Sequence, residues 1–375
     1  HRHRTSKPNY NTPSTKAPPG PTPPVHSTRQ THGRDHTEKP PGRHTTGRTE
    51  SPVPTKDKSK SKSKSKSKSK SKPQGKKRNR PATNRQNAKK RAETEDRHVL
   101  YELAVQGVEA EIDFVDETFN ELRGRPISTL REDFAGTCNT SCEFIKRRET
   151  NFAVGVDYDQ ETLDWGHANH ITKDLTTEQQ TRIAQVKDDV REATGIPQLN
   201  AMSAPDAEHG FDAVLAMNFS YFILQERAEL KRYFQHVRTT LKPDGILFLD
   251  CYGGYESYSE CEDPREIEPE TETGIKPFTY IWDQHTYNPI TGEMECRIHF
   301  KFPDKSKMKN AFTYTWRMWT LPEIRELLIE AGFKSATVYW EGADEDDPTE
   351  GNGEYTPTEV GDADPAWVCY LVAEK

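Results

Sequence analysis

The chain has 375 residues and a formal net charge of −7, but its charge is divided unevenly along the sequence. Residues 1–97 hold 27 Lys and Arg against 7 Asp and Glu, whereas the remainder holds 26 against 53. The first segment has too few apolar residues to form a core, so we expect residues 1–96 to be a disordered, basic, Pro/Lys/Ser-rich tail. No apolar run of about 18 residues exists, which excludes a membrane-spanning helix of that kind.

All six cysteines lie after the tail, and none forms a CxxC pair. We therefore expect free thiols and no metal site. No charged-then-apolar leader is visible at the start of the sequence. Together these features predict an intracellular, cytoplasmic protein, although the sequence begins at His1 rather than at a methionine.

The tail contains a strict Lys-Ser alternation from Lys58 to Lys72. Like charges keep such a segment extended and solvated. Two interpretations remain open: a solubilising linker, or a segment that binds nucleic acid or another polyanion by releasing counterions. Because no aromatic residues are interleaved for base stacking, we expect any such binding to ignore base sequence.

From residue 97 to residue 375 the pattern predicts a folded domain. Apolar residues at helical spacing predict one or two helices up to about Glu121, and Gly124 and Pro126 end them. Strands and helices then alternate, and the strands are apolar throughout, which indicates a doubly wound α/β fold with a parallel sheet. The expected elements are strand 127–133, helix 141–148, strand 152–157, helix 160–170, strand 183–190, strand 211–217, helix 226–241 and strand 246–251.

Residues 276–317 change to an alternating pattern that predicts an inserted, three-stranded antiparallel sheet. A helix at 321–331 and strands at 336–340 and 367–373 follow. The acidic stretches 256–272 and 341–364 are interpreted as solvated loops. Seven aromatic residues should share the covered face of the inserted sheet, either as core or as a cage for a substrate: Phe278, Tyr280, Trp282, Phe300, Phe302, Tyr314 and Trp316.

Two features mark a ligand site beyond the carboxyl ends of the parallel strands. The turn Glu132–Thr137 (EDFAGT) follows the first strand, and Gly136 lets the backbone approach a ligand closely. Asp157 ends the second strand about 20 residues later, where a carboxylate can accept both hydroxyls of a ribose. The turn lacks the glycines that cradle a pyrophosphate, so the site suits an adenosine without one. The alternative is that Asp157 only caps the helix that follows.

These motifs resemble those of the class I S-adenosylmethionine (SAM)-dependent methyltransferases, and the resemblance covers residues 97–375. The segment 132–138 (EDFAGTC) is similar to their first motif, with Phe134 and Cys138 at positions where glycine is usual. The motifs LREDFAGT, NFSY and WTLPEIRELLIEAGF resemble those of a little-characterised subfamily. The resemblance implies a Rossmann-like methyltransferase sheet, SAM as cofactor, and the inserted sheet as a wall of the substrate site.

Carried over residue by residue, the resemblance implies a cofactor site with the acid Glu132, the ribose acid Asp157, an adenine-reading segment at the third strand and a methyl-proximal segment at the fourth. The SAM-binding residues so implied are Glu132, Phe134, Ala135, Gly136, Asp157, Tyr158, Asp189, Val190, Asn218 and Phe219. No catalytic base is assigned, although Tyr221, His285 and Arg317 are candidates for side chains that face the acceptor.

We therefore expect an enzyme that transfers a methyl group from SAM to a nitrogen or oxygen of a small molecule. The acidic stretches favour a cationic or amine acceptor. Two alternatives stay open. The first is an RNA or protein methyltransferase recruited by the basic tail. The second is a non-catalytic protein of this fold that binds nucleic acid.

Overall fold

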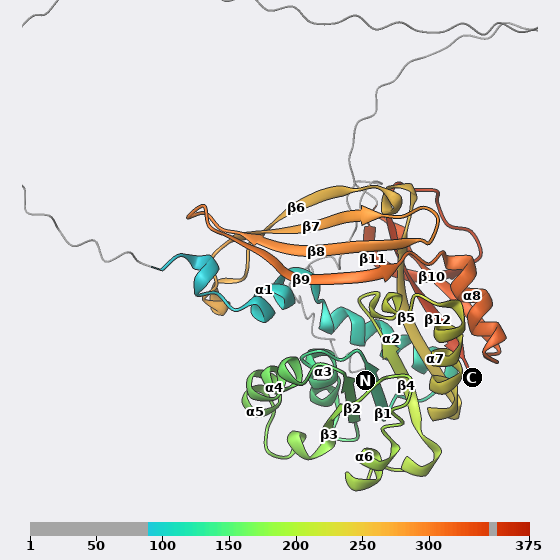
Figure 1. Cartoon of the computed structure of the whole chain (residues 1–375). Coiled ribbons are helices and arrows are strands. Elements are labelled where there is room, and N and C mark those ends of the chain that lie inside the picture. Colours follow the sequence, from blue (N-terminus) through green and yellow to red (C-terminus); the bar gives the residue numbers. More distant parts are fainter. Residues whose placement is uncertain (1–88, 345–350) are drawn as a thin grey trace, which may run out of the picture. The chain divides into compact units, whose positions relative to one another are not determined.

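A computed structural model describes residues 89–344 and 351–375. They form a large mixed sheet with helices on both faces and a second, antiparallel sheet beside its carboxyl edge (Figure 1). The predicted Lys-Ser segment lies outside the described residues. Among the residues that are described, no helix has the length and apolar character needed to cross a membrane.

The large sheet has eight strands in the order β11-β10-β12-β5-β4-β1-β2-β3. From β3 to β5 the neighbouring strands are parallel, whereas β12 is antiparallel to both β5 and β10. The chain builds outward from β1 in one direction and then from β4 in the other, so the strand order reverses between β1 and β4. The strands are β1 Thr129–Asp133, β2 Phe152–Asp157, β3 Ile183–Lys187, β4 Phe211–Ala216, β5 Leu241–Gly253, β10 Ser335–Ala343, β11 Gly351–Thr358 and β12 Trp367–Glu374.

Helices cover both faces of this sheet, as its apolar strands predict. On one face, α2 and α3 bury Phe119 and Phe144 against Leu130 and Phe248. On the other, α6, α7 and α8 pack over a second core that includes Val154 and Leu247. The helices are α1 Arg97–Val105, α2 Val108–Arg123, α3 Asn139–Arg147, α4 Gln160–Gly166, α5 Thr172–Asp174, α6 Ile196–Ala201, α7 Arg227–Thr240 and α8 Leu321–Glu330.

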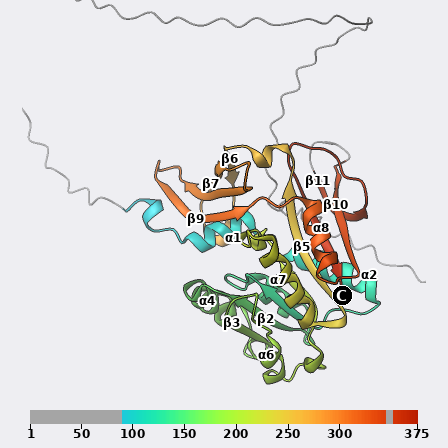
Figure 2. The same cartoon turned by 45° about the vertical axis from the view of Figure 1, so that its right-hand side comes forward.

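The second sheet has four strands in the order β6-β7-β8-β9, all antiparallel. Helix α1 lies beneath it in both ribbon views (Figures 1 and 2), and the two bury Leu100 and Val105 against Phe278 and Phe300. Six of the seven predicted aromatic side chains are in this core or at its margin, and Trp316 joins the core of the large sheet. The strands are β6 Cys261–Ile267, β7 Phe278–Tyr287, β8 Glu293–Lys301 and β9 Lys307–Arg317.

Three expectations are corrected here. Stretch 256–272 is not only a loop, because β6 lies within it and pairs with β7 along its whole length. Stretch 341–364 likewise contains β11, which pairs with β10. The folded part also begins before residue 97: Arg91 lies over the ring of Phe302, with 4.7 Å from its guanidinium carbon to the ring centroid. Edge strands with one exposed face need few apolar residues, so the hydrophobic pattern does not reveal them.

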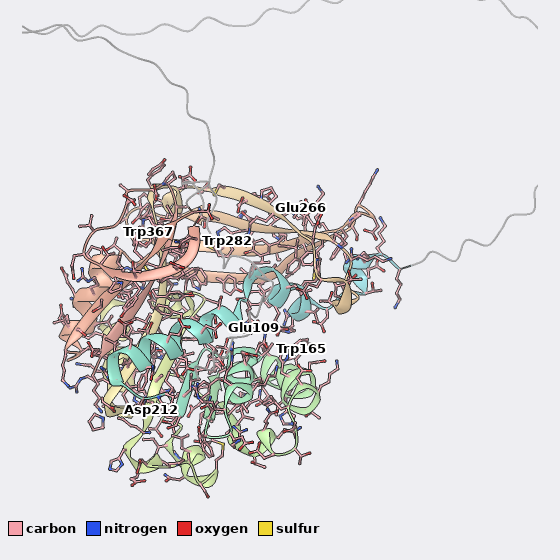
Figure 3. The ribbon with its side chains drawn as sticks, turned by 180° about the vertical axis from the view of Figure 1, so that it is seen from behind. Glu109, Trp165, Asp212, Glu266, Trp282 and Trp367 are labelled. Carbon is pink, nitrogen blue, oxygen red and sulfur yellow. The ribbon has the colours of Figure 1, made fainter. Side chains whose placement is uncertain are left out.

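The opposite edge of the large sheet carries a structural acid. Asp212, at the start of β4, accepts hydrogen bonds from Ser128 and Thr129 and pairs with Lys242 at 3.1 Å. Burial alone raises the pKa of Asp212, but Lys242 and these hydrogen bonds outweigh it and lower the pKa to about 2. Figure 3 shows Asp212 at the far end of the sheet from Trp282, which belongs to the four-stranded sheet. The amino edge is therefore held by a buried ion pair, and the carboxyl edge is left for a site.

Candidate functional site

The turn after β1 has an unusual backbone conformation. Phe134, Gly136 and Cys138 all have positive φ, at 57°, 51° and 59°. These are the three positions at which the resembling family has glycine, so the turn keeps a glycine-type shape with larger residues in it. Each non-glycine residue in this region costs roughly 1 kcal/mol or more. Packing compensates: Cys138 is fully buried with Ala135 and Leu163, and Phe134 meets the ring of Tyr233.

Asp157, at the end of β2, holds this turn. Its Oδ2 accepts the Gly136 N–H at 2.7 Å, and its Oδ1 accepts the Asp159 N–H at 2.8 Å. Partial burial raises the pKa of Asp157 above its ordinary value, and these hydrogen bonds oppose that rise. Each carboxylate oxygen has a second lone pair. The Asp157 carboxylate is therefore able to accept two further hydrogen bonds, as a pair of neighbouring ribose hydroxyls would require.

The next strand end is less open than the sequence predicts. Asp189 is engaged by Arg191, whose Nη2 lies 2.6 Å from the Asp189 Oδ2. This hydrogen bond lowers the pKa of Asp189. Val190 is buried, whereas the Tyr158 side chain is 77% exposed beside Asp157. An adenine ring bound here would contact the apolar side chain of Val190 and the exposed ring of Tyr158. The Asp189 carboxylate, in contrast, already pairs with Arg191.

The turn after β4 is shaped by an acid that sequence reasoning missed. Asn218 and Phe219 both have positive φ, and their N–H groups donate to the Asp250 carboxylate at 2.7 and 2.8 Å. Asp250 lies in β5, and burial raises its pKa to about 8. The signal for it was present: the run ILFLD ends in an acid as FAVGVD does. Asp250 thus holds the β4 turn by accepting its backbone N–H groups, as Asp157 holds the β1 turn.

Glu132, predicted as the acid of the first motif, faces inward. Its Oε2 accepts from the Ser141 N–H at 2.9 Å and from the Ser141 hydroxyl, which fixes the first turn of α3. Its neighbour Asp133 points to the other side of β1 and accepts from Arg131 and from the Tyr233 hydroxyl, each at 2.8 Å. Both acids support the turn from within.

The environment of Glu132 gives a pH-dependent prediction. Burial raises the pKa of Glu132 to about 8, against the opposing effect of the Ser141 hydrogen bonds. The folded protein therefore binds this proton more tightly than the unfolded chain, in which the pKa is about 4.3. The resulting stability is fully present below about pH 4 and is lost as pH rises toward 8. Glu132→Gln removes this titration, so its free energy of unfolding should fall less than that of the wild type between about pH 5 and 8. Urea unfolding across this range measures the difference, and parallel declines of the two proteins would contradict it.

A cavity lies between the β4 turn and the four-stranded sheet. Asn218, Phe219 and Ser220 form its side toward the large sheet. The remaining lining residues come from α1, β5 and the four-stranded sheet: Tyr101, Val105, Tyr252, Asp263, Arg265, Tyr280, Trp282, Ile298, Tyr314 and Trp316.

The aromatic side chains of this cavity pack on one another. The Tyr314 and Trp316 rings are stacked with centroids 4.8 Å apart, and Trp282 lies 5.9 Å from Trp316. Trp282 and Tyr314 are only partly buried. The aromatic residues of the alternating strands therefore fall into two groups. Phe278, Phe300 and Phe302 lie in the core, whereas Tyr280, Trp282, Tyr314 and Trp316 line a cavity, and a substrate cage there stays a prediction.

Comparison with solved structures identifies the fold. A SAM-dependent methyltransferase from Clostridium acetobutylicum ATCC 824 superposes with a TM-score of 0.51 at 14% identity, over 74% of this chain and 96% of that one. SAM-bound CalS10, an amino pentose methyltransferase from Micromonospora echinaspora involved in calicheamicin biosynthesis, gives 0.50 at 15% identity, over 74% and 95%. The chain has the fold of the SAM-dependent methyltransferases. A scan of protein-family models gives no match to the sequence, and a search of the curated proteins gives none either.

The three candidates for an acceptor-facing side chain lie outside the lining of the cavity. Tyr221 is fully buried, and its hydroxyl donates to the Asp250 carbonyl oxygen at 2.8 Å. Arg317 donates to the Gln225 carbonyl oxygen at 3.1 Å and lies over Trp319. His285 is on β7, with its Nδ1 3.5 Å from Asp283. None of the three is among the residues that line the cavity, so an acceptor-facing role for them stays a prediction without support from this cavity.

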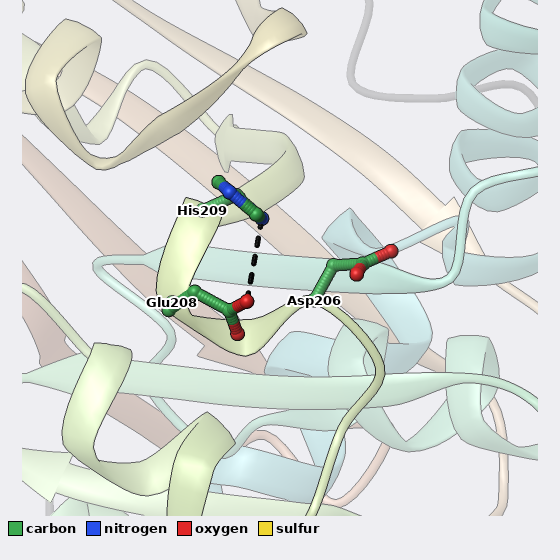
Figure 4. A group of neighbouring side chains, drawn as sticks. All are labelled: Asp206, Glu208 and His209. Atoms are coloured by element: carbon green, nitrogen blue, oxygen red, sulfur yellow. Dashed lines mark ion pairs between the residues drawn. The ribbon is translucent and has the colours of Figure 1, made fainter.

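Two groups of possible metal ligands occur in the described residues. Asp206, Glu208 and His209 are all exposed on one short turn, with a single 3.7 Å pair between His209 and Glu208 (Figure 4).

The second group is Glu262, Asp283 and His299 on the four-stranded sheet. There the Asn310 N–H donates to His299 Nδ1 at 2.8 Å. His299 Nε2 therefore carries the proton, and it donates toward Asp283 at 3.2 Å. A ligating histidine needs the reverse arrangement, with a lone pair toward the metal and its other nitrogen donating.

Proposed function

We propose that this protein is a SAM-dependent methyltransferase that transfers a methyl group to a nitrogen or oxygen of a small molecule. The observation that carries the proposal is the position of the aromatic-walled cavity. Asn218 and Phe219, on the β4 turn, line it, next to the switch point between β1 and β4. Ligands of doubly wound sheets bind at this point, so a donor over the β1 and β2 turns and an acceptor in the cavity would meet there.

The residues present fit the cofactor. The turn 134–138 offers backbone N–H groups in a glycine-type conformation, and Asp157 retains two lone pairs for a ribose. Val190 offers an apolar contact for the adenine, and Asn218 and Phe219 would face the transferred methyl group. SAM supplies an electrophilic methyl group when it is bound. The SAM-bound state of CalS10, which shares this fold, supports the assignment.

The protein's own contribution is positioning and the exclusion of water. The rings of Trp282, Tyr314 and Trp316 offer flat apolar surface against which an acceptor can be oriented. Helix α1 is linked to the β1 turn, because its Glu102 accepts a hydrogen bond from the Thr137 hydroxyl at 2.8 Å. Glu102 also pairs with His170 Nε2 at 2.8 Å. Burial opposes the charged form of His170, but its two carboxylate partners outweigh it and raise the pKa. A charged His170 would therefore strengthen its contact with Glu102 of α1.

The test is to incubate the full chain with methyl-labelled SAM and cell extract separated into small molecules, RNA and protein. We expect the label in the small-molecule fraction, because a concave site lined by aromatic side chains is typical of small-molecule binding. Asp157→Ala should abolish most of this transfer, since it removes hydrogen bonds to the cofactor. Label in RNA or protein, lost when residues 1–88 are removed, would favour the tail-recruited alternative. Absence of transfer together with absence of SAM binding would favour the non-catalytic one.

A further inference from the structure

Strand β6 turns one cationic side chain toward the cavity. Its residues alternate in exposure, so the carboxylates of Glu262 and Glu266 are exposed, whereas Asp263 and Arg265 line the cavity. The sequence showed an acidic stretch here and suggested a cationic or amine acceptor. The strand separates the charges instead: two acids lie outside, and the cavity receives one arginine and one aspartate.

The Arg265 guanidinium has unused hydrogen-bonding capacity. Its carbon lies 4.8 Å from the centroid of the Tyr280 ring, which orients the group within the cavity. The Arg265 Nη2 reaches the Ala104 carbonyl oxygen only at 3.5 Å, and its Nε is buried without a hydrogen-bond partner. Buried donors without partners destabilise a protein unless a ligand satisfies them.

The surrounding groups decide what kind of ligand would do so. Guanidinium donors are arranged to bind a carboxylate with two parallel hydrogen bonds. A phosphate carries up to two charges, and Asp263 on the same strand face would repel it more strongly than it would a single charge. The other walls are the rings of Tyr280, Trp282, Tyr314 and Trp316, which favour a flat, apolar body. The acidic group and the ring of such a ligand would then lie side by side.

We propose that the methyl acceptor is a flat-ringed carboxylate whose acid group is bound by Arg265 and whose ring packs on the aromatic wall. This inference rests on the proposed function and names the class of acceptor for the same site. Arg265 is then a specificity-determining residue: it holds the end of the acceptor remote from Asn218, so that the accepting nitrogen or oxygen faces the β4 turn.

A matched pair of probes tests the proposal by calorimetry on the full chain: 1-naphthoate, and 1-naphthamide, which has the same ring without the charge. We expect naphthoate to bind the wild type at least about tenfold more tightly than naphthamide, since a charged hydrogen bond in a closed site is of this magnitude. In Arg265→Gln the preference should fall to about one, and Arg265→Lys should retain part of it. The matched control is Arg297→Gln, which removes an arginine of the same sheet outside the cavity, where it pairs with Glu295.

Each outcome bears on the proposal. Equal preference in the wild type and Arg265→Gln would overturn it, and so would a wild type that binds neither probe or binds both equally. SAM affinity and thermal unfolding, measured on the same proteins, show whether each variant is folded. A wild type that prefers naphthoate but does not bind SAM would refute the proposed function and leave the anion-binding cavity in place.

Discussion

Replacing Gly166 by alanine should destabilise the protein by about 3 kcal/mol and weaken cofactor binding at the same time. A Cβ at this position would lie 2.7 Å from Thr137 Cα, 2.6 Å from its carbonyl carbon and closer still to its oxygen. These are backbone atoms of the turn 134–138, so the clash cannot be relieved by rotating a side chain. Either α4 or the turn must move. Urea unfolding measures the loss of stability, and calorimetry with SAM measures the loss of affinity.

The matched control for this variant is Gly107→Ala, between α1 and α2. A Cβ there would meet nothing within 4 Å, and the φ of Gly107 is negative at −116°, so the change brings no clash. We expect a loss of at most about 1 kcal/mol, because Gly107 is the N-cap of α2 and alanine is a poorer N-cap than glycine. A Gly166→Ala protein as stable as Gly107→Ala would show that the packing of α4 on the turn is not as described.

The second large effect is expected at Asp157. Asp157→Ala should weaken SAM binding by about 2 kcal/mol, or roughly 30-fold, because it removes charged hydrogen bonds to a partly buried ligand. The same change leaves the Gly136 and Asp159 N–H groups without their acceptor, so the unliganded protein should also unfold at a lower temperature. Asp157→Asn keeps one oxygen acceptor and should show a smaller loss of affinity.

Asp188→Ala serves as the control for charge alone. Asp188 is exposed, lies just beyond the end of β3, and accepts only the N–H of Asp189 in the described contacts. If Asp157→Ala and Asp188→Ala weakened SAM binding equally, the Asp157 carboxylate would have no special place in the site.

The parallel strands of the large sheet were predictable because each strand's own sequence shows the pattern that identifies it. Strand β2 occurs at the predicted residues 152–157, since a strand covered on both faces is a continuous apolar run. Strand β6 was missed because its sequence, CEDPREI, has charges on both faces. Its pairing with β7 is decided by the neighbouring strand rather than by its own composition. Strand β11 was missed because most of its residues are exposed and few of them are apolar.

The candidate site was predictable to a similar extent. Asp157 and Gly136 fall together, joined by a hydrogen bond, as the spacing of the two motifs suggests. The substitutions at Phe134 and Cys138 suggested a departure from the family, yet their backbone keeps the glycine-type conformation. Arg265 could not be found from the sequence, because its role depends on how strand β6 folds over a cavity formed by α1, β5 and β9.

A crystal structure of the protein with S-adenosylhomocysteine tests the central claim most directly. We expect the ribose hydroxyls on the Asp157 carboxylate, the adenine against Val190, and the sulfur facing Asn218 and Phe219 where these residues line the aromatic cavity. Binding of S-adenosylhomocysteine away from the β1 and β2 turns, or with its sulfur directed away from the cavity, would contradict it.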